Sequence, residues 1–317
     1  MLNTRKTHRM QASTRMLLSS VLAAVPMTLG VVATAPTANA STVTSVYSLF
    51  SQNSATAALN YAVFGLGGTN KTNVNLSAVT VNGNVAVGPD GSLSLMAPST
   101  INGNVDMDST ATPKNPGPGK YTGTLDTSES FSSLAADVVN ASTQAQNLTA
   151  TQTISSDVTT ATTITGTSGL NVIDINGNIN LNNANLTFSG AGAQFIVNIS
   201  GSVSLVGTAS ILAGSNVSDG NILLNLYSNS GTLNTHVGDT TDGIVLAPTA
   251  SLNLDGVFNG ELISGGGTIA LLSNSTVNYA TASVPLPIPA TLPLLCGGLL
   301  GLGLIALRKR RLMPPNR

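Results

Sequence analysis

The chain has 317 residues, of which 12 are basic, 13 are acidic and only 3% are aromatic. Nine basic residues lie in the first 15 or last ten positions, so residues 41–283 carry three lysines, no arginine and all 13 acids, a net charge near −10. Nucleic acid is excluded as a partner, because neutralising phosphates requires a basic surface. Binding to an anionic membrane surface is disfavoured for the same reason.

Cysteine usage and apolar content limit the fold class. The single cysteine, Cys296, rules out a disulfide framework. Residues 41–283 combine low charge with many aliphatic residues, which is not the composition of a disordered chain. We therefore predict one mainly β domain whose surface is covered by short polar side chains.

Residues 1–40 have the features of a secretory signal peptide. Four basic residues precede the largely apolar stretch Met16–Ala35, and Ala38 and Ala40 frame an A-x-A cleavage site. We expect export by the Sec machinery and a mature chain that starts near Ser41. The alternative is that this signal helix stays uncleaved and anchors the chain.

An Asn-Gly-Asn repeat marks the first strands. It occurs at residues 82–84, 102–104 and 176–178, and apolar residues alternate with polar ones on both sides of each copy. This period of two is typical of half-buried strands. Asn-Gly supplies the positive φ that a tight turn needs.

The spacing of the later strands favours a parallel β-solenoid. Strand centres fall every 18 to 27 residues, which suits one coil of a solenoid, at Ile175, Val197, Leu224, Val245 and Ile263. Asparagines at equivalent turns would then hydrogen-bond from one coil to the next. A β-sandwich is the alternative architecture.

One long amphipathic helix is predicted over residues 126–148. Asp126 is the expected N-cap, with Glu129 at capping-box spacing. Phe131, Leu134 and Val138 begin an apolar stripe with helical spacing. We expect the helix to pack along the solenoid.

Few residues are candidates for chemistry, and we expect no catalytic residue and no cofactor. His236 is the only histidine between residues 41 and 283 and stands in a polar loop. The carboxylate pairs Asp106 with Asp108 and Asp239 with Asp242 are the alternative, since paired carboxylates can hydrolyse polysaccharides. The pair Asp239 and Asp242 is also a weak Ca²⁺ candidate, although a solvated turn is the simpler interpretation.

The threonine-rich run 158–167 would place hydroxyl and methyl groups on one flat face if it were extended. Regular threonine faces are how many ice-binding solenoids order water. The β-propensity of threonine on a solvent-facing strand is the simpler explanation.

Several segments resemble known bacterial surface domains. Residues 195–201, 221–226, 243–250 and 260–264 are similar to the choice-of-anchor A domain, also called collagen-binding-like, over about residues 61–278. The order of strands, long helix and more strands also resembles bacterial ice-binding β-solenoids. Neither resemblance supplies catalytic residues.

The tail, residues 284–317, has the layout of a sorting signal. A stiff proline motif precedes 20 uncharged residues, 288–307, which are long enough to cross a bilayer as a helix. A basic cluster then stops transfer. The residues of the motif and of the cluster are Val284, Pro285, Leu286 and Pro287, and Arg308, Lys309, Arg310 and Arg311.

This order resembles the PEP-CTERM class of tails, most closely its Val-Pro-Leu-Pro variant. The resemblance implies recognition by an exosortase, a membrane transpeptidase of Gram-negative bacteria. Pro285-Leu286-Pro287 replaces the commoner Pro-Glu-Pro, and this departure leaves open which exosortase is the cognate enzyme. A plain membrane anchor is the alternative.

Together these observations predict an exported protein that passes the inner membrane and periplasm and then reaches the outer surface or extracellular matrix of a Gram-negative bacterium. A structural or adhesive role is expected, with polysaccharide, matrix proteins or ice as partners. The alternatives are an ice-binding protein and, less favoured, a polysaccharide-active β-helix enzyme.

Overall fold

The computed structural model describes residues 42–115, 117, 119–272 and 275–280. Within these residues no helix has the length and apolarity needed to cross a bilayer. The signal segment 1–40, including Ala38 and Ala40, and the tail 284–317 lie outside the described residues.

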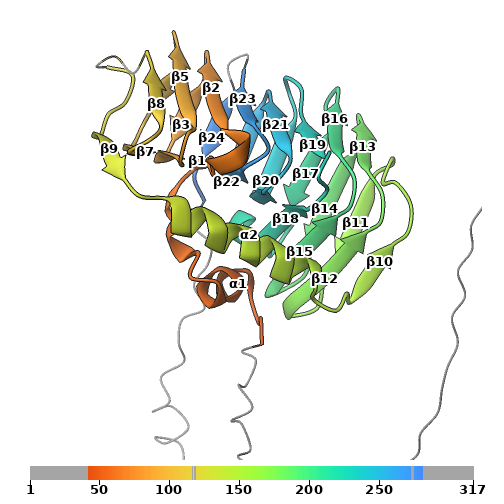
Figure 1. Ribbon diagram of the computed structural model, residues 1–317. Helices are drawn as coiled ribbons and strands as arrows, with labels where there is room; N and C mark the ends of the chain where they lie inside the picture. The colour runs from red at the N-terminus through yellow and green to blue at the C-terminus, as the bar shows by residue number, and fades with distance from the viewer. Residues whose placement is uncertain (1–41, 116, 118, 273–274, 281–317) are drawn as a thin grey trace, which may run out of the picture. The chain divides into compact units, whose positions relative to one another are not determined.

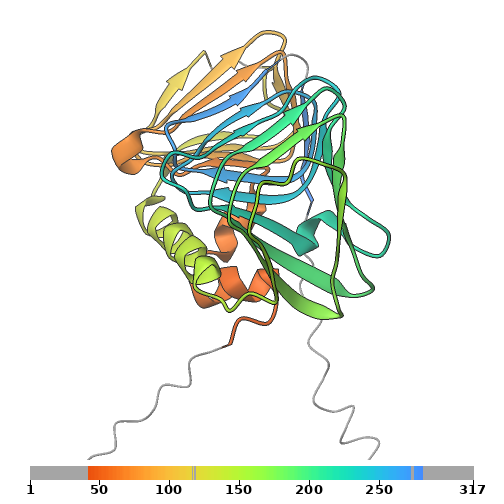
Figure 2. The same cartoon turned by 90° about the vertical axis from the view of Figure 1, so that its right-hand side faces the viewer.

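The described chain is a parallel β-solenoid with a helix packed alongside, which confirms the predicted fold (Figures 1 and 2). All strand pairs in the described residues are parallel, so the antiparallel β-sandwich alternative is wrong. Each coil contributes strands to three faces, which we call A, B and C.

Face A is covered by helices. Its strands, in spatial order, are β10 (Gln152–Ile154), β12 (Gly169–Ile175), β15 (Ala193–Ile199), β18 (Ile222–Leu226), β20 (Thr240–Ala247), β22 (Val257–Ser264), β1 (Val63–Gly65), β4 (Val85–Val87), β7 (Val105–Asp108) and β9 (Leu125–Glu129).

Faces B and C complete each coil. Face B runs through β13 (Ile179–Asn182), β16 (Val203–Val206), β19 (Thr232–Asn234), β21 (Ser251–Leu254), β23 (Thr268–Leu271), β2 (Asn73–Ser77), β5 (Ser92–Met96) and β8 (Thr112–Lys114). Face C runs through β11 (Thr162–Thr165), β14 (Asn185–Ser189), β17 (Ser210–Ala213), the first residues of β20 and β22, β24 (Thr276–Asn278), β3 (Thr80–Asn82) and β6 (Thr100–Ile101).

The coils do not follow one another in chain order. The chain starts in the middle, where β1, β2 and β3 pair with β22, β23 and β24 of the last coil. It winds outward to β9, returns along helix α2 (Ser132–Gln146), and winds back from β10 to the middle (Figure 1). We call the junction of the first and last coils the seam.

Two apolar clusters hold this arrangement together. One fills the inside of the solenoid with inward-pointing Val, Ile, Leu and Phe side chains. The other lies between face A and the helices α1 (Val46–Gln52), η1 (Thr56–Asn60) and α2. Both consist of residues between Val46 and Val277, so this part of the chain contains a complete core of its own.

Helix α2 is shorter than predicted, and its predicted cap is wrong. It begins at Ser132, and its N-cap Phe131 makes no side-chain capping bond. Asp126 and Glu129 belong instead to β9, because pairing with β7 satisfies their backbone in one more coil. The stripe is confirmed: Phe131 and Val138 are buried in the second cluster.

The Asn-Gly-Asn repeats form two different corners. Residues 82–84 and 102–104 turn the chain from face C to face A, and residues 176–178 turn it from A to B. Gly83 has the expected positive φ of 151°. Gly103 does not have a positive φ. A glycine is needed there for close packing, because a Cβ at residue 103 would lie 2.5 Å from the carbonyl oxygen of Gly83.

Stacked corner asparagines hydrogen-bond from coil to coil, as predicted. Oδ1 of Asn84 accepts the backbone N–H of Asn104 at 2.9 Å, and Oδ1 of Asn104 accepts that of Thr124 at 3.0 Å. Each side chain therefore satisfies a backbone donor that the turn leaves unpaired.

Candidate functional site

Among the residues that the structure describes, no α-helix lies over face B or face C (Figure 2). Their outward side chains therefore meet solvent. On face C the middle residue of each short strand is buried, Val81 and Val277 for example. Its two neighbours therefore point outward. The outward residues of successive coils align in two straight files.

The first file consists mainly of threonine. Parallel pairing places Thr240, Val257, Thr276, Thr80 and Thr100 next to one another on five successive coils. Among the described residues, none of these four threonine hydroxyls has a hydrogen-bond partner. The file therefore presents methyl groups and free hydroxyls at the strand spacing of about 4.8 Å.

The second file is an asparagine ladder two residues further along each strand. The side-chain amides donate in one direction: Asn102 to Asn82 at 2.7 Å, Asn82 to Asn278 at 2.9 Å, Asn278 to Asn259 at 2.9 Å, and Asn259 to Asp242 at 2.9 Å. These bonds fix the side chains and give the threonine file a rigid border.

Asp242, one of the two Ca²⁺ candidates, ends this ladder. Its other oxygen, Oδ2, accepts the backbone N–H of Ala213 at 2.9 Å. Asp239 lies in the turn before β20, where its Oδ2 accepts the N–H of His236 at 2.6 Å. Burial raises the pKa of Asp239, and the hydrogen bond from His236 only partly offsets this increase.

The two Ca²⁺ candidates do not form a metal site with other residues. Both carboxylate oxygens of Asp242 accept hydrogen bonds from N–H donors. The described residues contain no cluster of three metal-binding side chains.

His236 lies on the exposed corner between faces B and C. Its Nδ1 is 2.6 Å from the carbonyl oxygen of Leu205, and no nucleophile of the described chain bonds to the ring.

The other carboxylate pair, Asp106 and Asp108, lies on face A at the end where α2 begins. Oδ2 of Asp106 accepts the Tyr61 hydroxyl at 3.1 Å, and Oδ2 of Asp108 accepts the backbone N–H of Phe131 at 3.0 Å. Burial raises the pKa of Asp106. Burial acts the same way on Asp108, but hydrogen bonds from Phe131 and Thr110 outweigh it and lower its pKa. The Asp108 carboxylate thus orders the entry to the helix.

The threonine run 158–167 contributes only partly to a flat face. Thr163 and Thr165 are exposed on β11 at the far end of face C, where Thr163 pairs with Thr187. The threonine file of Thr240, Thr276, Thr80 and Thr100 was not predicted from the sequence. Its sequence signal is a repeated Thr-x-Asn at residues 80–82, 100–102 and 276–278, whose strands lie side by side only in the folded chain.

Face B is also polar. Its central file is Asn180, Ser204, Asn234, Asn253, Ala270, Asn75, Ser94 and Lys114. It has no continuous threonine row, and Lys114 puts a charge at one end.

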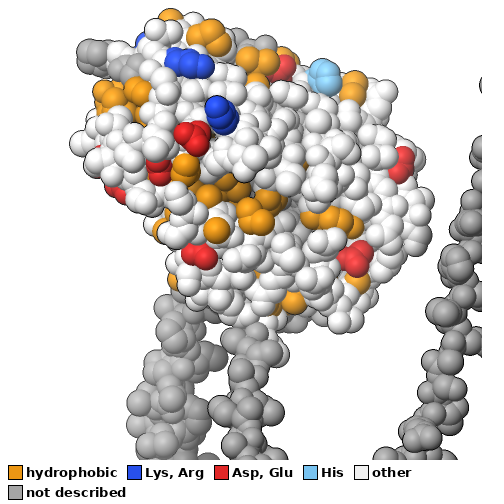
Figure 3. Space-filling model, in the orientation of Figure 1, with side chains coloured by type: hydrophobic (Ala, Val, Ile, Leu, Met, Phe, Trp, Pro, Cys, Tyr) orange, Lys and Arg blue, Asp and Glu red, His pale blue; other side chains and the backbone are white. Residues whose placement is uncertain are grey.

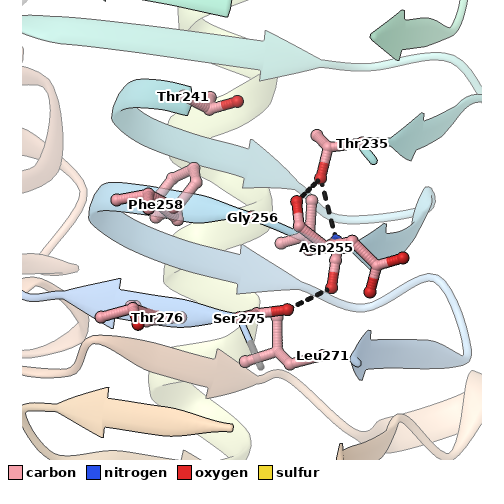
Figure 4. Close-up of a pocket in the computed structure, with 11 residues that line it drawn as sticks. Thr235, Thr241, Asp255, Gly256, Phe258, Leu271, Ser275 and Thr276 are labelled. Atoms are coloured by element: carbon pink, nitrogen blue, oxygen red, sulfur yellow. Dashed lines mark hydrogen bonds between the residues drawn. The ribbon is translucent and has the colours of Figure 1, made fainter. Parts of the chain in front are cut away.

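A small cavity lies under the corner between faces B and C (Figure 4). Thr235 Oγ1 donates to the carbonyl oxygen of Asp255 at 2.6 Å, and Ser275 Oγ donates to that of Leu254 at 3.0 Å. Its volume of about 10 Å³ holds at most one water molecule. This cavity is too small for a ligand.

A family comparison matches residues 37–279 to the ice-binding-like adhesive domain. The chain belongs to this family. Comparison with curated proteins gave no match.

Solved ice-binding proteins share the fold of this family member. A protein from an Antarctic biological consortium is 18% identical, with a TM-score of 0.50 over 70% of this chain and 88% of its own. A protein of the Antarctic ascomycete Antarctomyces psychrotrophicus is 19% identical, with a TM-score of 0.51 over 71% and 96%. A Flavobacteriaceae protein is 21% identical, with a TM-score of 0.53 over 74% of this chain and 49% of its own. The resemblance to ice-binding solenoids is thus confirmed for the fold.

Proposed function

We propose that this domain binds the surface of ice through face C. The observation that carries the proposal is the threonine file bordered by the asparagine ladder on five successive coils. Free hydroxyls and methyl groups repeat there at a fixed spacing on a rigid sheet. Such an array can hold water in regular positions with little loss of side-chain entropy on binding.

The family match and the folds of the similar structures support this reading over a purely structural role.

Thermal hysteresis and inhibition of ice recrystallisation test the proposal on purified domain 42–280. Thr276→Tyr places a bulky ring in the middle of the threonine file and should abolish most of both activities. Asn253→Tyr makes a comparable change in the middle of face B and should leave them nearly unchanged. Loss in the Asn253 variant alone would assign the activity to face B, and no activity in the parent would refute ice binding.

Export and sorting form a second part of the proposal. We propose that the chain is exported by the Sec route and is processed at its tail by an exosortase-like enzyme, so that the domain reaches the cell surface or matrix as an adhesive module without catalytic activity. The support is the sequence of residues 1–40 and 284–311. Intact-mass measurement of the surface protein should show that residues 308–317 are missing; a retained C-terminus would make the tail a plain anchor.

A further inference from the structure

The asparagine ladder of face C has a direction. Every amide bond in it runs the same way, from Asn102 at one end toward Asp242 at the other. The donor–acceptor distances lie between 2.7 and 2.9 Å, so all of these bonds are well formed. Each asparagine between the two ends therefore has its Nδ2 on the side of Asp242 and its Oδ1 on the side of Asn102.

A row of asparagines does not by itself fix such a direction. A carboxamide carries a donor group and an acceptor group of similar size and shape. Turning every amide of the ladder by 180° would give a second ladder with the same number of bonds between asparagines. The direction is therefore set at an end of the row, by a residue that is not an asparagine.

Asp242 stands at one end. The register of β17 beside β20 places Leu212 next to it, and a leucine side chain neither donates nor accepts a hydrogen bond. Asp242 itself is only 8% exposed. Its Oδ1 accepts the side-chain amide of Asn259 and its Oδ2 accepts the backbone N–H of Ala213, both at 2.9 Å. The ladder thus ends on a buried carboxylate that receives a donor from each side.

The low charge of the protein makes an acid in this row notable. The side of the molecule drawn in Figure 3 is mostly uncharged, with only scattered acidic and basic side chains. Asp242 is the one charged residue of the ladder. Because N–H donors contact both of its oxygens, its carboxylate serves as a double acceptor rather than as an exposed surface charge.

The backbone donor is the fixed point of the arrangement. The N–H of Ala213 belongs to a strand and cannot turn, so the atom of residue 242 that faces it has to be an acceptor. A carboxylate has an acceptor on both sides and takes the N–H of Ala213 and the amide of Asn259 together. An asparagine at position 242 would use its only oxygen for Ala213 and would turn its own amide toward that of Asn259.

Two facing amide donors leave each other without an acceptor, which is unfavourable in a partly buried row. The conflict is removed only if Asn259 turns over. Asn259 would then present its amide to Asn278, so every asparagine beyond it has to turn over as well. The identity of one side chain at the end therefore decides the orientation of the whole ladder.

We propose that Asp242 is the positioning residue of face C. Its carboxylate sets the direction of the ladder, and the direction decides where along the face each amide presents an N–H and where it presents a carbonyl oxygen. Water held between the ladder and the threonine file then meets one pattern of donors and acceptors instead of a mixture of two. The inference rests on the proposed function, because this pattern matters only if face C orders water.

The variant Asp242→Asn tests the direction on purified domain 42–280. Trans-hydrogen-bond NMR couplings identify the donor nitrogen and the acceptor carbonyl carbon of each ladder bond without reference to ice. In the parent we expect a coupling from Nδ2 of Asn278 to Cγ of Asn259. In the variant this coupling should be lost or replaced by the reverse one, from Nδ2 of Asn259 to Cγ of Asn278. An unchanged coupling would overturn the proposal.

The double variant Asp242→Asn with Asn259→Asp is the matched control. It has the composition and net charge of the parent, and it moves the carboxylate one coil along the row. The carboxylate at position 259 accepts from both neighbours, so the coupling from Nδ2 of Asn82 to Cγ of Asn278 should return to the parent direction. If this coupling stays reversed, the effect belongs to residue 242 alone and the proposal fails.

Thermal melts cover the case in which Asp242→Asn does not fold. The double variant should then regain a melting transition close to that of the parent, since every donor of the ladder again has an acceptor. A double variant that does not fold either would show that Asp242 acts only through local stability, and the positioning role would be wrong.

Thermal hysteresis tests the link with ice. At equal protein concentration Asp242→Asn should lose most of the activity of the parent, and the double variant should recover it. Full activity in a variant whose couplings are reversed would contradict the positioning role. A parent without hysteresis would instead refute the proposed ice binding itself, whichever direction the couplings show.

Discussion

The side-chain amide of Asn82 donates a hydrogen bond of 2.9 Å to Oδ1 of Asn278, although 196 residues separate the two in the sequence. This bond crosses the seam, where β3 of an early coil pairs with β24 of the last. The asparagine ladder therefore continues without interruption across a break in chain order. The seam is built like any other junction between coils, and the candidate face extends over both halves of the chain.

Breaking the ladder at Asn278 should destabilise the domain. In Asn278→Asp the new carboxylate cannot donate to Oδ1 of Asn259, which is 2.9 Å away. The lost bond and the facing oxygens should cost about 1–3 kcal/mol, and for a domain of this size each kcal/mol lowers the Tm by roughly 2–4 °C. Asn180→Asp on face B makes the same chemical change without a ladder bond and should leave the Tm nearly unchanged.

Stacked corner glycines should be intolerant of a side chain. A Cβ at Gly103 would lie 2.5 Å from the carbonyl oxygen of Gly83, which belongs to the rigid backbone of the next coil. Gly103→Ala should therefore lower the free energy of unfolding by about 1–3 kcal/mol in denaturant titrations. Gly117→Ala is the matched control, since nothing lies within 4 Å of its Cβ position; equal effects of both variants would contradict the stacking argument.

Two adjacent valines of α2 should respond differently to truncation. Val138 is fully buried against face A, whereas Val139 is 44% exposed. Val138→Ala leaves a cavity and should cost about 2 kcal/mol, while Val139→Ala should cost less than about 0.5 kcal/mol. Chemical denaturation monitored by circular dichroism measures both, and similar values would show that the helix does not pack by the predicted stripe.

Glu261 should make the domain less stable as pH rises. It is fully buried at the seam, neither carboxyl oxygen has a partner among the described residues, and burial raises its pKa from 4.5 to about 9. Between these values the folded state holds a proton that the unfolded state has released. The free energy of unfolding therefore falls as pH rises through this window and levels off above about 9.

The variant Glu261→Gln tests this pH dependence, because its amide is neutral at every pH. Thermal melts from pH 4 to pH 10 should show a flatter profile for the variant than for the parent, with the largest gain in Tm at alkaline pH. Asp90→Asn, which removes an exposed carboxylate, serves as the control and should follow the parent. A parent profile that does not fall above pH 5 would contradict the assignment.

Sequence periodicity by itself determined the local structure. Alternating apolar residues predicted the strands, and the stripe from Phe131 to Val138 predicted the helix, because side-chain direction depends only on local backbone geometry. The stacking of corner asparagines also followed from their repeat. Composition argued against a disulfide framework and against a nucleic-acid partner.

Only the tertiary structure decided which coils are neighbours. Nothing local to residues 80–82 or 276–278 indicates that they lie side by side, since parallel pairing depends on the return path of α2 and on the seam. Asp126 is a second example. Its local sequence favours a helix cap, but it lies in β9, because β7 at the end of the solenoid provides a pairing partner for its backbone. Face C exists because distant segments of the chain pair with one another, and this pairing is set by the packing of the whole core rather than by any single stretch of sequence.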